Sequence, residues 1–171
     1  MASNLWKRVL ERMSSYPARV RVARLMVELG LRVSDKGGVA CGPVEIGDLA
    51  LARAAGVDRR VVKRTVDLIL TDRLLTRIFS GLRPAGALLA PISKPLGFGV
   101  VEIRADPSAV GVLARAAKIV ADQGISIRQA VAEDPDLFPE PKLILVLEKP
   151  LPGEAINSLM RVPSVQSVTT Y

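Results

Sequence analysis

The spacing of apolar residues changes near residue 95 and divides the chain into two parts. Before this point, apolar residues recur every three or four positions, as they do on one face of a helix. The pattern predicts helices at 5–13, 17–31, 46–55, 58–70 and 72–82. Three glycines within 34–43 predict a loop that encloses a short strand at 39–41, and 75–90 fits either a helix or a wing.

After residue 96, apolar and polar residues alternate in short segments, which is typical of strands. We expect strands at 97–104, 125–131, 143–147 and 165–170, and helices at 111–123 and 153–161. The resulting order, βαββαβ, is the ferredoxin-like arrangement. The sequence therefore predicts an α+β chain, with a helical domain at 1–83, a packed, proline-punctuated connector at 84–95 and a ferredoxin-like domain at 96–171.

Composition excludes several kinds of catalytic and metal site. The 171 residues include no histidine and only one cysteine, Cys41. This composition rules out a Ser-His-Asp triad and a Cys-His pair. It also rules out a Cys/His zinc cluster and an internal disulfide. There is no glycine-rich phosphate loop and no long apolar run. We expect a cytoplasmic protein that is not an enzyme, with no cofactor, metal site or membrane segment.

Charge is distributed unevenly between the two parts. The net charge of +7 comes from a net +9 over residues 1–95 and a net −2 over residues 96–171. A basic half beside an acidic half indicates that the basic half contacts a polyanion. An arginine-rich surface with no such partner also fits the composition.

Residues 46–69 have the pattern of a helix-turn-helix. Gly56 permits a turn with positive φ between two helices, and Asp58 is suited to cap the second helix. The second helix begins with four basic residues that span an arc of roughly 140° on a helical wheel. These candidate DNA-binding residues are Arg59, Arg60, Lys63 and Arg64. A basic face at this position suits docking in the major groove; a solvated basic helix, or a unit that contacts only protein, is the alternative.

The second part resembles the ACT domain, a small-molecule sensor fold. The residues that carry the resemblance are the strand ending at Arg104, the loop 106–111, the helix start at 112–113, the segment 123–127 and the segment 162–165. In that family an amino acid typically binds where the first strand meets the helix, often between two subunits. The resemblance implies contacts from Asp106 and Ser108, and from Ser126 on the facing strand.

Further candidate ligand-binding residues in this part are Gly111, Val112, Leu113 and Gln129. Gly111 lets the backbone approach a ligand closely, and free N–H groups at a helix start can receive a carboxylate. A ferredoxin-like module that only forms dimers is the alternative.

The combination of a helix-turn-helix with an ACT-like domain resembles a family of archaeal regulators of amino-acid metabolism, above all in 56–62 and 127–135. This resemblance implies a homodimeric or higher-oligomeric transcriptional regulator with DNA and an amino-acid effector as partners. The alternative is an ACT-type interaction module that regulates a metabolic enzyme without binding DNA.

Overall fold

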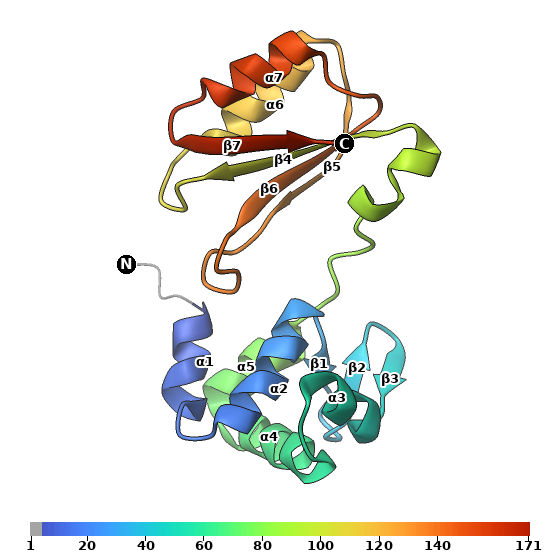
Figure 1. Ribbon diagram of the computed structural model, residues 1–171. Coiled ribbons are helices and arrows are strands. Elements are labelled where there is room, and N and C mark those ends of the chain that lie inside the picture. Colours follow the sequence, from blue (N-terminus) through green and yellow to red (C-terminus); the bar gives the residue numbers. More distant parts are fainter. Residues whose placement is uncertain (1–4) are drawn as a thin grey trace. The chain divides into compact units, whose positions relative to one another are not determined.

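The computed structural model describes residues 5–171, which form a mixed α+β chain of two compact units (Figure 1). The first unit ends at Gly86, and the second begins at Ala87 and continues to Tyr171. Each unit has its own hydrophobic core, so each is described by itself.

The first unit is mainly helical and contains one small sheet. Its helices are α1 (Leu5–Met13), α2 (Pro17–Glu28), α3 (Asp48–Ala55), α4 (Arg59–Thr71) and α5 (Arg73–Gly81). Its strands are β1 (Arg32–Val33), β2 (Val39–Cys41) and β3 (Val44–Ile46), which pair antiparallel in that order. The helices α2, α3 and α4 pack on one another. The five predicted helices are present, but α2 ends at Glu28 and not at 31, and residue 46 belongs to β3, so that α3 begins at Asp48. The predicted strand at 39–41 is the central strand of this sheet.

The segment after α4 is a helix and not a wing. The side chain of Asp72 accepts hydrogen bonds from the backbone N–H groups of Leu74 and Leu75, at 2.8 and 2.9 Å, and so caps the start of α5. On its inner side α5 buries Leu75 and Phe79. The cap and the apolar stripe together favour helix over strand for this segment.

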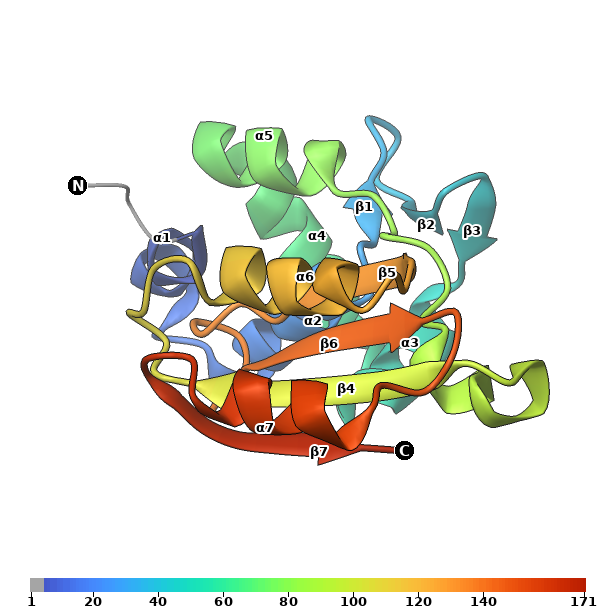
Figure 2. The ribbon, with the colours of Figure 1, turned by 90° about the horizontal axis from the view of Figure 1, so that it is seen from above.

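The second unit has the ferredoxin-like topology that the sequence predicts. Its main elements are β4 (Gly99–Ala105), α6 (Val112–Asp122), β5 (Ile127–Ala132), β6 (Lys142–Leu147), α7 (Gly153–Met160) and β7 (Val165–Thr170). The four strands form one antiparallel sheet in the order β5-β6-β4-β7, and both helices cover one face of it (Figure 2). The core between helices and sheet includes Val101, Ile103, Val120, Leu145 and Leu159.

The chain that precedes β4 lies against the opposite face of the same sheet. It contains two short 3-10 helices, η1 (Ala90–Ile92) and η2 (Lys94–Leu96). Ala90 is buried there with Val100 and Val146. The side chain of Gln129 accepts a hydrogen bond from Leu89 N and donates one to the carbonyl of Ala87, each at 2.8 Å. Both faces of the sheet are therefore partly covered.

A change of register in β5 alters which side chains share a face. Simple alternation places Ile127, Gln129 and Val131 on one side, but the pairing with β6 shifts between Ile127 and Gln129. Consequently Ile127 packs under the helices, whereas Val131 packs on the opposite face of the sheet. An irregularity of this kind adds one residue to one strand and reverses the alternation beyond it.

Candidate nucleic-acid interface and effector pocket

The helices α3 and α4 are joined by a tight turn with the geometry that the sequence predicts. Gly56 has φ of 62° and ψ of 43°, and Val57 N donates to the carbonyl of Ala52 at 3.0 Å. Asp58 then caps α4, since its Oδ1 accepts a hydrogen bond from Arg60 N at 2.7 Å. The cap fixes where α4 begins and therefore which side chains lie on its first turns.

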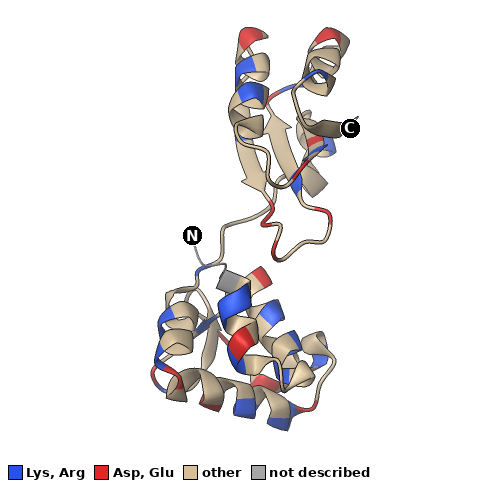
Figure 3. Ribbon diagram, turned by 90° about the vertical axis from the view of Figure 1, so that its left-hand side faces the viewer, with Lys and Arg blue, Asp and Glu red and all other residues tan. Residues whose placement is uncertain are grey.

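The helix α4 has one buried face and one basic face. Val62, Thr65, Val66 and Ile69 are buried in the first unit. The four basic residues predicted to bind DNA are all exposed, and they occupy the first two turns: Arg59, Arg60, Lys63 and Arg64. Basic residues are frequent on the helices of this unit (Figure 3). The structure thus brings the four predicted residues together on one surface.

The four basic side chains have no acidic partner in the described part of the chain, unlike some other basic groups of the same unit. Arg24 pairs with Glu28 at 2.8 Å and Arg12 pairs with Asp72 at 3.0 Å. By contrast, within residues 5–171 none of the four at the start of α4 forms an ion pair or a side-chain hydrogen bond with the protein. Their charge is therefore available to an external polyanion.

The Asp58 cap gives a stability prediction. Asp58→Ala removes the acceptor for Arg60 N and should lower the free energy of unfolding of the first unit by about 1 kcal/mol. Asp58→Asn is the matched control, because an asparagine side chain also caps helices well. Urea titration followed by the fluorescence of Trp6, the single tryptophan of the chain and a buried residue of this unit, measures the change. Equal losses for the two variants would contradict a capping role.

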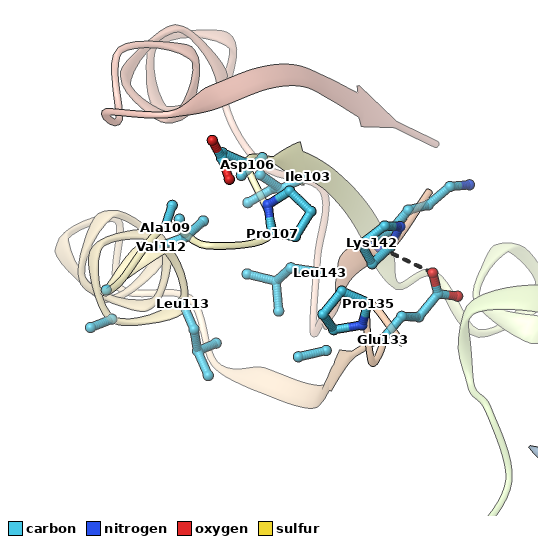
Figure 4. Close-up of a pocket in the computed structure, with 15 residues that line it drawn as sticks. Ile103, Asp106, Pro107, Ala109, Val112, Leu113, Glu133, Pro135, Lys142 and Leu143 are labelled. Carbon is cyan, nitrogen blue, oxygen red and sulfur yellow. Dashed lines mark hydrogen bonds between the residues drawn. The ribbon is translucent and has the colours of Figure 1, made fainter. Parts of the chain in front are cut away.

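In the second unit, a cavity of about 510 Å³ lies where β4 ends and α6 begins. Most of its wall is apolar, and Figure 4 shows Leu143 inside it, with Pro107, Val112 and Pro135 around it. Four of the predicted ligand-binding residues line this cavity: Asp106, Gly111, Val112 and Leu113. The first turn of α6 starts at Gly111, with φ of 84°, and no side chain caps it.

The ionisable groups at this cavity are mainly acidic. Asp106 Oδ1 accepts hydrogen bonds from the hydroxyl and the backbone N–H of Ser108, at 2.7 and 2.8 Å, and these lower the pKa of Asp106. Glu133 Oε2 accepts one from Lys142 N at 3.0 Å. The Lys142 ammonium lies on the opposite face of the sheet, bound to Glu102 Oε2 at 2.8 Å. Asp106 and Glu133 are therefore the two carboxylate residues of the lining, and Glu133 is already bonded to the backbone.

The remaining predicted ligand-binding residues do not line this cavity. Ser108 reaches it only through its hydrogen bonds to Asp106. Ser126 precedes β5, at the end of that strand opposite to the cavity-lining Ala132. The side chain of Gln129 holds the segment before β4, because the irregularity in β5 directs it to the other face.

Several lining residues were not predicted from the sequence, among them Ala132, Glu133 and Pro141. They come from the end of β5 and from the loop before β6. The signal for them was the antiparallel pairing of β5 with β6, which brings the end of one strand beside the start of the other. The sequence alone does not fix the register of this pairing, so it does not show which residues lie beside the start of β6.

Comparisons with known proteins give little support for a function. No family model matches the chain, and no curated protein matches it. One similar solved structure is an AsnC-family transcriptional regulator from Agrobacterium tumefaciens, with 15% sequence identity and a TM-score of 0.27. The similarity covers 90% of this chain and 86% of that chain. A TM-score this low carries no argument, so the proposals below rest on the geometry of the chain.

Within residues 5–171, no helix has the length and apolar character needed to cross a membrane. In the same part of the chain, no three or more His, Cys, Asp and Glu side chains are grouped so as to hold a metal ion.

Proposed function

We propose that this chain is a DNA-binding transcriptional regulator whose second unit senses an amino acid or a related small metabolite. The observation that carries the proposal is the start of α4, where Arg59, Arg60, Lys63 and Arg64 are exposed and unpaired on a capped helix after a tight turn. These features suit the second helix of a helix-turn-helix unit, which enters the major groove with its first residues.

The four residues have different roles in this proposal. Arg59 and Arg60 pair with guanine edges, because the arginine fork fits guanine O6 and N7 in a bidentate manner. Lys63 and Arg64 neutralise phosphates of the DNA backbone and position the helix. The buried residues of α4, Val62 and Val66 among them, keep the helix fixed on the first unit.

A gel-shift titration of the full chain against genomic fragments, at about 50 and 200 mM salt, tests the DNA-binding proposal. We expect some fragments to be retained over others, with affinity falling as salt rises. Retention of all fragments alike would show sequence-neutral binding by the basic unit, and no retention at the lower salt would refute the proposal.

The cavity at the start of α6 supports the sensing part of the proposal. Asp106 receives the ammonium group of an amino acid, and the uncapped N–H groups at the start of α6 receive its carboxylate. An apolar side chain then lies along Ile103, Val112 and Leu143. Binding where two subunits meet would alter the spacing of two recognition helices, which must match half-sites about one helical turn apart.

Calorimetric melting of the full chain with each of the twenty amino acids, following the transition of the second unit, tests the sensing part of the proposal. A ligand that binds only the folded state raises the melting midpoint. At a free ligand concentration of 100 times its Kd, it raises the free energy of unfolding by about 2.7 kcal/mol. We expect amino acids with apolar side chains to raise it, and Asp106→Asn to weaken their binding about tenfold.

The matched control for that variant is Asp122→Asn, at the far end of α6, where the carboxylate pairs with Lys118 at 2.8 Å. It removes the same charge and should leave binding unchanged. If no amino acid shifts the midpoint at millimolar concentration, the second unit is an interaction module and the sensing role is refuted.

A further inference from the structure

A second cavity, of about 320 Å³, lies directly beside the basic face of α4. Its wall is formed by the first turn of α2, with Tyr16 and Arg19, and by α4, with Val61 and Arg64. The hydroxyl-bearing Ser15 completes one side of it. Two helices that are distant in sequence thus contribute one arginine each to the same cavity.

The lining of this cavity is suited to an anion. Arg19 and Arg64 both line it, and none of its lining residues is Asp or Glu. Within residues 5–171, neither arginine forms an ion pair or a side-chain hydrogen bond with the protein. Two positive charges in the lining of one cavity favour the binding of an anion there.

Tyr16 holds one of these arginines in position. The guanidinium carbon of Arg19 lies 4.0 Å from the centre of the ring of Tyr16, a residue that is 50% exposed. Stacking on the ring leaves the edge N–H groups of a guanidinium free to donate hydrogen bonds. Arg19 is therefore oriented before any ligand arrives, and less conformational entropy is lost on binding.

The cavity is also fixed relative to the proposed recognition helix. The helix α2 packs against α3 and α4, and Arg21 Nη2 donates to the carbonyl of Gly56 in the turn at 3.5 Å. Arg64 belongs both to the cavity and to the exposed basic face of α4. An anion in the cavity would consequently lie next to whatever α4 contacts.

We infer that this cavity binds a phosphate of the DNA backbone, gripped between Arg19 and Arg64 at the edge of the groove that α4 enters. The inference rests on the proposed DNA-binding function and adds a site from a second helix. The ligand chemistry is a phosphodiester: Arg19 donates from its stacked guanidinium, Arg64 donates from α4 and the Ser15 hydroxyl donates from the loop before α2. Such a contact sets register and is the same for every sequence.

Fluorescence-anisotropy titrations of Arg19→Ala on a preferred and an unrelated duplex, over a range of salt, test the inference. The variant should bind both duplexes about tenfold more weakly near 0.1 M salt. The slope of log affinity against log salt should become less steep by about 0.9, as expected for one lost phosphate contact. The preference between the two duplexes should stay unchanged.

Two further variants separate the stacked arrangement from simple charge. Tyr16→Phe keeps the ring and should bind as the wild type does, whereas Tyr16→Ala should lose part of the affinity that Arg19→Ala loses. Arg24→Ala is the matched control on the same helix, because its side chain is paired with Glu28. It removes the same charge and should leave both affinity and salt slope unchanged.

The outcomes are distinguishable from those of the proposed function. If the wild-type chain binds no duplex, the DNA-binding proposal and this site both fail. If it binds, and Arg19→Ala has the wild-type affinity and salt slope, only the phosphate site is overturned. A loss that is confined to the preferred duplex would also overturn it, since it would make Arg19 a base-reading residue.

Discussion

Replacing Arg59 and Arg60 together with alanine should lower the affinity for a preferred duplex by about 100-fold. A good bidentate contact to a base contributes about 1–3 kcal/mol of discrimination, and about 1.4 kcal/mol is a factor of ten. Both side chains lie on the exposed first turn of α4 and have no partner in residues 5–171. Their removal therefore costs few contacts within the protein and acts mainly on binding.

The same double variant should retain weaker, sequence-neutral binding, because Lys63 and Arg64 remain to contact phosphates. Competition titrations with the preferred duplex and an unrelated one measure affinity and preference together. The matched control is the pair Arg73→Ala and Arg77→Ala, which removes two exposed charges from α5. Equal losses in the two double variants would mean that total charge, and not the position of α4, determines binding.

The second large expected effect is a loss of stability at Gly30, where the segment after α5 packs closely against the end of α2. Gly30 has φ of +62°, and a Cβ built there would lie 2.4 Å from the carbonyl oxygen of Arg83 and 2.6 Å from Pro84 N. These are backbone atoms of the chain that leaves α5. Gly30→Ala should cost about 3 kcal/mol or more, through the left-handed conformation and through the displacement of this segment.

Gly56→Ala separates the two contributions. Gly56 has the same φ of +62°, yet nothing lies within 4 Å of a Cβ built on it. This variant should lose only the conformational part, about 1 kcal/mol. Because Trp6 is buried in the first unit, urea titration followed by its fluorescence reports on this unit alone. Similar losses for the two glycines would contradict the close approach between Gly30 and the segment after α5.

The features that were predicted correctly from the sequence are local ones. The turn at Gly56, the Asp58 cap and the periodicity of α4 depend on residues close together in the chain, and all are present. The order βαββαβ is also predicted correctly, because the spacing of apolar residues within each element indicates whether it is a helix or a strand. The surface of α4 follows directly from these local features.

The features that were missed depend on pairing between distant segments. The direction of Gln129 is set by a register change against β6, which the alternation of its own strand does not reveal. Of the small sheet, the sequence predicts only the strand at 39–41, because strands of two or three residues carry almost no periodic signal. The cavity beside α2 forms only because α2 packs on α4, and the sequence does not predict this contact. Tyr16 is therefore not among the binding residues predicted from the sequence.

Methylation interference at guanine N7 on a selected duplex tests the central claim, that α4 enters the major groove, most directly. N7 lies in that groove, where a methyl group blocks both an arginine contact and the close approach of a helix. The account predicts interference at discrete guanines of the preferred duplex, and its loss at one or more of them in the variant with Arg59→Ala and Arg60→Ala. Binding that is indifferent to methylation at every guanine would contradict it.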